Sequence, residues 1–388
     1  MTDRPYTFYE FFAGGGMARI GLGARWRCAF ANDVDPKKAA AYADNFDADH
    51  FSLGDVAALT PGDLPGRVDL AWASFPCQDL SLAGGGRGLK GARSGVFWAF
   101  YGLMTALRAN GRAPRLIVLE NVCGLLTSRG GADFGALVSA LAADGRSVGA
   151  LVLDAAPYTA QSRPRLFMVA ADADTPLSAR ANDDPDPATP PPALRRAVAR
   201  FEPATARAWR WLVAPPPPDA SPHLADLIER APNDVAPDPP NETARLLAMM
   251  SPVNRARVDT AQEEARRAGR PVVGALYRRT RPGPDGRRVQ RAEARFDGLA
   301  GCLRTPAGGS SRQRLIIVEP DAVRTRLVSA REAARLMGLP DTYRLPARYN
   351  DAYKLLGDGV SPPVVRALAR DVLEPLLKAR RAMRRAAA

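Results

Sequence analysis

Cys77 is the residue whose setting best suits covalent chemistry. It follows Pro76 at the end of the apolar run 68–74, which has the pattern of a buried strand. A free cysteine is most often a small buried hydrophobe. A thiol on a turn beyond a strand is instead a nucleophile when nearby cations lower its pKa. The glycine-rich, basic segment 78–95 follows and predicts a loop that closes over a substrate.

Three charged residues have the types and positions to assist such a nucleophile. Glu120 ends another apolar run, so its carboxyl group is expected at the same sheet edge as Cys77, either capping a helix or facing a nucleic-acid base. Arg163 and Arg165 alternate as the chain enters the run 165–171, which predicts that both side chains share one face. Buried unpaired arginines are costly, so we expect this pair to bind an anion or a carbonyl oxygen.

A glycine turn and two acids predict an adenosine pocket. Gly14 and Gly16 follow the first apolar run, where glycine lets the backbone approach a ligand. Asp33 ends the second run and is placed to bind ribose hydroxyls; Asp55 follows the third and is placed to accept from an adenine amino group. The glycines by themselves are equally compatible with a tight turn that binds no ligand. The two acids at successive strand ends favour a nucleotide-like cofactor.

These residues require a sheet that positions them along one edge. Apolar runs alternate with helix-like segments through the first 170 residues, a pattern typical of an α/β, doubly wound, mostly parallel sheet. Ligands of such sheets bind beyond the carboxyl ends of the strands. The runs span residues 7–13, 27–33, 51–53, 68–74, 115–121, 147–155 and 165–171.

The distribution of charge indicates a polyanionic partner. The 388 residues carry a net charge of +13. Residues 1–170 hold 17 Lys and Arg against 15 Asp and Glu, whereas residues 245–314 hold 16 Arg against 6 acids. Concentration of the excess in one later segment favours a nucleic-acid-binding surface over a merely solvated face.

Composition also indicates in which compartment the protein is found and whether it binds a metal. Four cysteines far apart and two histidines predict no zinc site and no metal, and the thiols should stay reduced. No apolar run approaches the roughly 20 residues of a membrane helix, and the N-terminus lacks the pattern of a signal peptide. We therefore expect a cytoplasmic protein that does not bind membranes.

Taken together, the motifs resemble those of the bacterial type of DNA (cytosine-5)-methyltransferases. The resemblance covers about residues 1–170 and 325–377. It rests on Phe12-Ala13-Gly14, Gly16, Asp33, Asp55, Pro76-Cys77-Gln78, Glu120-Asn121-Val122, Gln161, Arg163, Arg165 and Gly357-Asp358-Gly359-Val360.

The resemblance implies a Rossmann-like fold, S-adenosylmethionine as cofactor and double-stranded DNA as substrate. It assigns to Cys77 addition at C6 of a flipped-out cytosine and to Glu120 hydrogen bonds to N3 and the exocyclic amine. Arg165 would bind O2 of the base, and Arg163 would support it or bind a phosphate. The residues implied to hold the cofactor are Phe12, Ala13, Gly14, Gly16, Asp33, Val34, Asp55, Val56, Pro76 and Asp358.

Three positions depart from the family pattern. Glu10 stands where an aspartate is frequent, Val34 where a tryptophan often packs on adenine, and Asp358 where asparagine is usual. The last change would alter loop or cofactor contacts. None removes a core chemical group, so activity is expected.

Composition shifts suggest the domain boundaries. Residues 1–175 are expected to form the catalytic and cofactor-binding domain, followed by a proline-rich linker. Residues 190–325 would form a smaller, loop-rich target-recognition domain. Residues 326–388 would form a C-terminal segment with a helix capped by Ser329 and Glu332 and a last helix returning to the catalytic domain.

Other functions are compatible with parts of the pattern. A tRNA cytosine-5 methyltransferase shares the same chemistry, and a catalytically silent DNA-binding protein would keep the same scaffold. A nucleotide-dependent oxidoreductase would explain only the glycine turn. The long basic module favours DNA, and we expect a monomer that associates with the nucleoid through DNA and has a restriction endonuclease as its functional counterpart.

Overall fold

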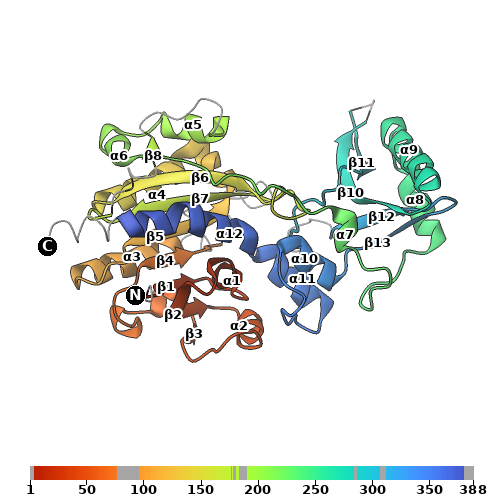
Figure 1. Cartoon of the computed structure of the whole chain (residues 1–388). Coiled ribbons are helices and arrows are strands. Elements are labelled where there is room, and N and C mark those ends of the chain that lie inside the picture. The colour runs from red at the N-terminus through yellow and green to blue at the C-terminus, as the bar shows by residue number, and fades with distance from the viewer. Residues whose placement is uncertain are drawn as a thin grey trace. The chain divides into compact units, whose positions relative to one another are not determined.

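The computed structural model describes residues 4–76, 96–175, 177, 181–182, 190–283, 286–305 and 312–379. Cys77 and the loop 78–95 therefore lie outside the described residues. The chain forms two compact units (Figure 1). Unit 1 comprises Met1–Asp154, Pro164–Pro216 and Val360–Ala388, and unit 2 comprises Ala155–Arg163 and Pro217–Gly359.

Unit 1 is built on a seven-stranded sheet with the order β3-β2-β1-β4-β5-β7-β6. The first five strands pair in parallel, and β7 runs antiparallel to β5 and β6. The strands are β1 (Tyr6–Phe11), β2 (Trp26–Asp33), β3 (Phe51–Leu53), β4 (Leu70–Ala73), β5 (Leu116–Val122), β6 (Ser147–Asp154) and β7 (Pro164–Ala171). The predicted mostly parallel α/β sheet is confirmed, and each predicted apolar run overlaps one of these strands.

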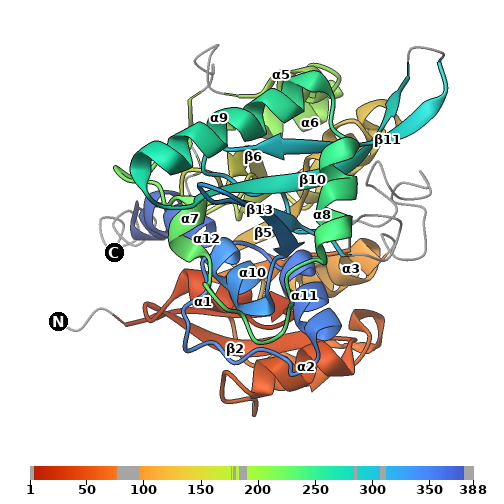
Figure 2. The ribbon, with the colours of Figure 1, turned by 90° about the vertical axis from the view of Figure 1, so that its right-hand side faces the viewer.

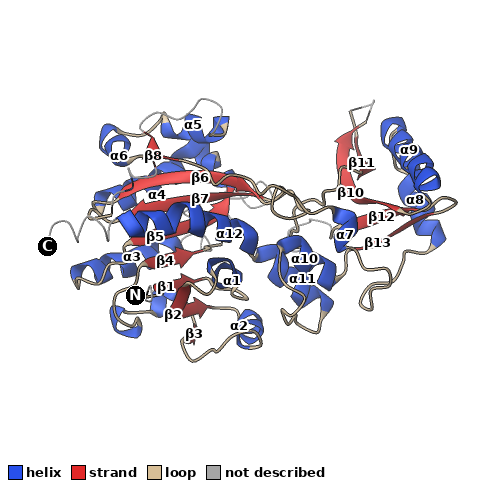
Figure 3. Cartoon of the chain, viewed as in Figure 1, coloured by secondary structure: helices blue, strands red, loops and turns tan. Residues whose placement is uncertain are grey.

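Helices cover both faces of this sheet (Figure 3). The helices of unit 1 are α1 (Met17–Leu22), α2 (Pro36–Ala43), α3 (Val96–Ala109), α4 (Ala132–Ala143), α5 (Pro192–Val198), α6 (Pro203–Ala208) and α12 (Pro362–Leu368), and among them α5 and α6 contact α4. The last helix continues beyond α12 through a π-helical turn, Ala369–Leu373. Short strands β8 (Ala181–Asn182) and β9 (Trp211–Leu212) form a separate pair.

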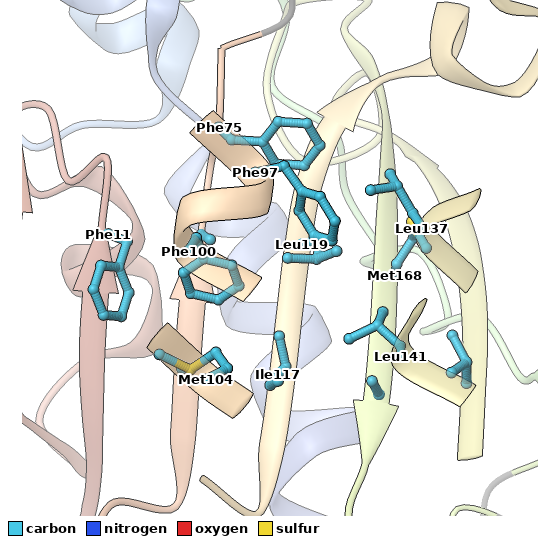
Figure 4. Packing of buried hydrophobic residues seen from close by; sticks show 14 of the residues in the cluster. Phe11, Phe75, Phe97, Phe100, Met104, Ile117, Leu119, Leu137, Leu141 and Met168 are labelled. Carbon is cyan, nitrogen blue, oxygen red and sulfur yellow. The ribbon is translucent and has the colours of Figure 1, made fainter. Parts of the chain in front are cut away.

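One face of the sheet packs against α3 and α4 through large apolar side chains (Figure 4). Phe97, Phe100 and Met104 of α3 recur at helical spacing and meet Phe11 and Ile117 of the strands. Removing such side chains from water is the main favourable contribution to folding. This packing fixes the positions of the strand ends that carry the site.

Unit 2 contains a four-stranded antiparallel sheet with the order β11-β10-β12-β13. Its strands are β10 (Val272–Pro282), β11 (Arg288–Arg295), β12 (Arg314–Val318) and β13 (Val323–Leu327). Its helices are α7 (Leu224–Leu227), α8 (Pro240–Ala248), α9 (Pro252–Ala268), α10 (Ala330–Met337) and α11 (Tyr349–Asp358). The predicted capping box of α10 is present, with the Ser329 hydroxyl accepting from the Glu332 amide at 3.0 Å.

The module expected after residue 190 contains long connections between its elements, but it also contains long regular elements. The helix α9 has 17 residues and β10 has 11. Arginines replace apolar residues along half of β10, which hides the period-two pattern from a reading based on hydrophobicity.

The compact units also divide the chain elsewhere than expected. Residues 190–216 belong to unit 1, because Leu194, Ala197 and Trp209 enter its core and the Trp209 ring lies 6.0 Å from that of Phe134. Residues 326–359 belong to unit 2, because β13 pairs with β12. Proline-rich composition concealed the first of these packing segments.

No helix in the described part of the chain is both long and apolar enough to span a membrane. Within the same residues, no group of three or more histidine, cysteine or acidic side chains is arranged to hold a metal ion.

Candidate active site

The glycine turn after β1 has a backbone that requires glycine. Gly14 and Gly16 have φ of 56° and 74°, in the left-handed region where a side chain is strained. A Cβ at Gly16 would lie 2.3 Å from the ring of Phe46, whereas a Cβ at Gly14 would meet nothing within 4 Å. Gly16 is thus required by packing, and Gly14 leaves open space above the turn.

Asp33 ties the end of β2 to this turn. Its carboxylate accepts from the Gly14 amide at 2.8 Å and from the Asp35 amide at 2.9 Å, and the residue is buried. Asp55 follows β3 and is exposed, with its carboxylate accepting from the Ala57 amide at 2.9 Å. Both predicted acids therefore stand at neighbouring strand ends.

Two apolar positions flank these acids. The Val34 side chain is 65% exposed beside Asp33, while Val56 after Asp55 is buried. Phe12 has φ of 56° although it is not glycine, and Ala13 donates its amide to the Asn32 carbonyl at 2.9 Å. A strained residue at a strand end is a frequent mark of a functional turn.

Glu120 and Arg165 form an ion pair at the same edge. Arg165 Nε lies 3.4 Å from Glu120 Oε1, and both side chains are mostly buried. Glu120 precedes the last two residues of β5, and Arg165 follows Pro164 at the start of the antiparallel β7, opposite Val122. The antiparallel direction of β7 brings its beginning to the carboxyl edge of the parallel strands.

Asn121 holds the chain that leaves β4. Its side-chain amide donates to the Phe75 carbonyl at 3.0 Å, and its carbonyl oxygen accepts from the Val122 amide at 2.9 Å. This bond fixes the backbone immediately before Pro76, two residues before Cys77. In the sequence, Asn121 stands out only as a member of the motif Glu120-Asn121-Val122. Its role as an anchor depends on Phe75, which is 46 positions away.

Arg163 belongs to unit 2 and stands directly before β7, which begins at Pro164. Its carbonyl accepts from the Ala155 amide at 3.3 Å, so the pairing of β6 with β7 continues to this residue. The guanidinium is buried and donates to the carbonyls of Leu303 at 2.9 Å, Gly357 at 2.8 Å and Gly359 at 2.6 Å. These acceptors give Arg163 a role in holding the segments of unit 2 together.

Asp358 also belongs to unit 2, at the end of α11. Its carboxylate accepts from the Thr305 hydroxyl and lies 4.0 Å from Lys354 Nζ. The nearby Gln161 is fully buried and bridges the Leu336 carbonyl at 2.9 Å and the Leu303 amide at 3.0 Å. The other described candidate residues all lie in unit 1.

Glu10 is a feature that the sequence marked only as a departure. It is 1% exposed in the middle of the sheet, on β1, and Oε1 accepts from the Arg19 amide at 3.3 Å. Oε2 has no hydrogen-bond partner among the described residues. Burial, with the charge of Asp33 as a smaller contribution, raises the pKa of the Glu10 carboxyl to about 8. The side chain is therefore mostly protonated at neutral pH.

A partly buried polar cluster lies beside α1. Arg19 Nη1 donates to the Tyr42 hydroxyl at 2.9 Å and lies 3.0 Å from His50 Nε2. The Arg19 guanidinium also stands 4.4 Å from the centre of the Phe46 ring, which packs beneath Gly16. Burial lowers the pKa of His50, with Arg19 adding to the effect. The cluster supports the glycine turn from below.

The sheet order, the glycine turn and the acids at successive strand ends define a Rossmann-like α/β protein of the cofactor-binding class. A family model for C-5 cytosine-specific DNA methylase matches residues 6–374, and the chain belongs to that family. It is therefore a DNA (cytosine-5-)-methyltransferase, as the sequence motifs predicted.

Individual relatives agree with the family. The chain is 24% identical to the type II methyltransferase M.HaeII of Haemophilus aegyptius, over 97% of this chain and 96% of the relative. It is 31% identical to M.BsuFI of Bacillus subtilis over 42% of this chain and 38% of that protein. The structure of the Entamoeba histolytica methyltransferase EhMeth shares the fold, with a TM-score of 0.62 and 14% identity over 97% of this chain and 99% of that one.

Proposed function

We propose that the chain transfers a methyl group from S-adenosylmethionine to C5 of a flipped-out cytosine in double-stranded DNA, through a covalent bond between Cys77 and C6. The observation that carries this proposal is the Glu120–Arg165 pair at the carboxyl edge of the sheet. It lies beside the chain that leads from β4 to Cys77, which Asn121 anchors.

The residues at the glycine turn suit the cofactor. Open space above Gly14, the exposed Val34 side chain and the carboxylates of Asp33 and Asp55 would receive its adenosine. When bound there, S-adenosylmethionine supplies an electrophilic methyl group for C5 of the base. The other members of the predicted set in unit 1 are Phe12, Ala13, Gly16, Val56 and Pro76, and Asp358, the remaining member, belongs to unit 2.

The protein side chains would make C5 reactive. C5 of cytosine is a weak nucleophile, and addition of the Cys77 thiolate to C6 turns it into an enamine-like carbon. Glu120 would hydrogen-bond N3 and the exocyclic amine and so stabilise the charge that develops on the ring. Arg165 would bind O2. Loss of the C5 proton and departure of Cys77 then restore the aromatic ring.

The Glu120–Arg165 contact supports these two roles. Positioned 3.4 Å apart, the two side chains hold each other in place before a base arrives. Both groups are mostly buried, so little water competes for them, and their interactions with a bound base are stronger than they would be in solvent. A base stacked in a duplex is out of reach of any such site, so the target must be flipped out.

Relatives named as type II methyltransferases suggest the biological setting. We propose that methylation by this chain protects a short DNA sequence from a partner restriction endonuclease.

The test is transfer of the methyl group from labelled S-adenosylmethionine to duplex DNA, with nucleoside mass spectrometry to identify 5-methylcytosine. Cys77→Ser and Glu120→Gln should lower turnover by at least 10²-fold, with cofactor binding retained. Label in tRNA rather than DNA would contradict the proposed substrate. Full turnover by Cys77→Ser would contradict the covalent step.

A further inference from the structure

The hairpin of β10 and β11 extends beyond its own sheet. β12 pairs with β10 only from Val272 to Leu276, whereas β11 pairs with β10 as far as Pro282. From Tyr277 onward no further strand of the sheet pairs with β10, and on the side of β11 an isolated bridge joins Ala292, opposite Arg278, to Met250. Beyond Arg278 and Ala292 the two strands form a ribbon of two strands. Figure 2 shows the end of this ribbon standing clear of the sheet and of α8.

The base of the ribbon is firmly anchored. Leu276 of β10 and Ala292 and Ala294 of β11 enter the hydrophobic core of unit 2, together with Val258 of α9 and Ile316 of β12. A two-stranded ribbon alone is marginally stable in water, so this core must hold its projecting part.

Beyond the core, one face of the ribbon changes from apolar to polar. Because side chains alternate, the face that buries Leu276 continues as Arg278 and Thr280. In register, Arg278 is opposite the buried Ala292, and Gln290 and Arg288 follow on the same face opposite Thr280 and Pro282. We name this part of the ribbon the free face; its four exposed residues are Arg278, Thr280, Arg288 and Gln290.

The free face has unneutralised positive charge. Arg278 and Arg288 form no ion pair or hydrogen bond with any other residue that the structure describes. The charge of Arg278 acts on the carboxylate of Glu242 on α8, and that carboxylate is already held by Arg245 at 2.7 and 2.8 Å.

The opposite face of the ribbon is different. Glu293 there accepts from Arg281 at 2.6 and 3.0 Å and lies 3.5 Å from Arg279. Arg279 also stands directly across from Arg291, and like charges in that relation destabilise a hairpin. Glu293 cannot neutralise Arg279, Arg281 and Arg291, so this face also keeps a net positive charge. The two faces differ because the free face carries no acidic residue.

We propose that the free face reads base edges in the major groove of double-stranded DNA, which makes Arg278 and Gln290 determinants of the methylated sequence. This rests on the proposed function of the chain. The groove, about 12 Å wide, admits a two-stranded β-ribbon. Arginine pairs with guanine, glutamine pairs with adenine, and threonine contacts the thymine methyl group.

The experiment compares substitutions on the two faces of the ribbon, made in the full chain. Arg278→Ala and Gln290→Ala alter the free face, and Arg281→Ala removes the same charge as Arg278→Ala from the opposite face. Each is expressed in a host without cytosine methylation, and bisulfite sequencing of the host DNA gives the methylated motif. Kinetics on a duplex with the wild-type motif then measure kcat/KM.

We expect Arg278→Ala and Gln290→Ala each to relax the motif at one base pair and to lower kcat/KM on the original site about 10- to 100-fold. Arg281→Ala should retain the motif and change kcat/KM less than about 3-fold, as exposed ion pairs contribute little. An unchanged motif in both free-face variants would overturn the proposal. So would an equal effect of Arg281→Ala.

If the wild-type chain methylates no DNA, the proposed function is refuted. The role of the ribbon would then be tested by measuring nucleic-acid binding. Fluorescence anisotropy with a 30-base-pair duplex and with tRNA, at several salt concentrations, separates the cases. Loss of duplex affinity in Arg278→Ala but not in Arg281→Ala would uphold the ribbon as a DNA-binding surface. If Arg278→Ala instead lowered the affinity for tRNA and left the affinity for the duplex unchanged, the proposal would be overturned.

Discussion

Replacing Glu10 by glutamine should make the stability of unit 1 less dependent on pH. The carboxyl is buried in the sheet and its pKa is raised from 4.5 to about 8 by burial. Between these values the folded protein keeps a proton that the unfolded chain has released. The free energy of unfolding of the wild type therefore falls as pH rises from about 4.5 to 8 and levels off above pH 8.

The size of the effect follows from the two pKa values. At 1.36 kcal/mol per pH unit, the buried carboxyl costs about 1 kcal/mol at pH 5 and about 3 kcal/mol at pH 7. Glutamine has nearly the same shape and does not titrate in this range. The stability of Glu10→Gln relative to wild type should thus rise by about 2–3 kcal/mol between pH 5 and pH 7.

Urea unfolding followed by tryptophan fluorescence measures this difference. All five tryptophans belong to unit 1, at positions 26, 72, 98, 209 and 211, so the signal reports that unit. Glu202→Gln, a change at an exposed glutamate of the same unit, serves as the matched control. A difference between Glu10→Gln and wild type that stays constant from pH 5 to 7 would refute the assignment of a protonated buried carboxyl.

Three further substitutions test individual contacts in the two units. Gly16→Ala should destabilise unit 1 by about 2 kcal/mol, because it strains a left-handed residue and meets Phe46, and thermal melting measures the loss. Glu332→Gln should cost about 3–5 kcal/mol in urea unfolding, because it leaves the buried Arg326 guanidinium without its carboxylate partner at 2.6 Å; a loss below 1 kcal/mol would contradict this. Asn121→Ala should lower kcat for methyl transfer at least 10-fold with little change in cofactor affinity, because the chain before Pro76 loses its anchor. Equal losses of affinity and turnover would argue against that role.

The strands and the edge residues of unit 1 were predictable from local pattern. Continuous apolar runs of strand length fix which segments are buried, and polar residues at their ends fix which side chains reach the carboxyl edge. Asp33, Asp55 and Glu120 therefore stand where the sequence placed them. The capping box of α10 was likewise visible, because it depends on residues only three apart.

The role of Arg163 was decided by tertiary structure. The alternation of Arg163 with Arg165 shows that both enter the same strand, but whereas Arg165 pairs with Glu120 in unit 1, Arg163 is held within unit 2. Its acceptors are the carbonyls of residues 303, 357 and 359, more than 130 positions away in the chain. No local pattern specifies such partners.

The extent of the units and the protonation of Glu10 were also beyond local reasoning. Residues 190–216 pack in unit 1 because Trp209 finds apolar partners there, despite a composition that resembles a linker. The carboxyl of Glu10 keeps its proton because strands distant in the sequence exclude water from it. The sequence alone determined which chemical groups the protein has and the order in which the strands present them. The tertiary structure decided which groups are buried and paired, because burial and pairing depend on contacts between distant segments.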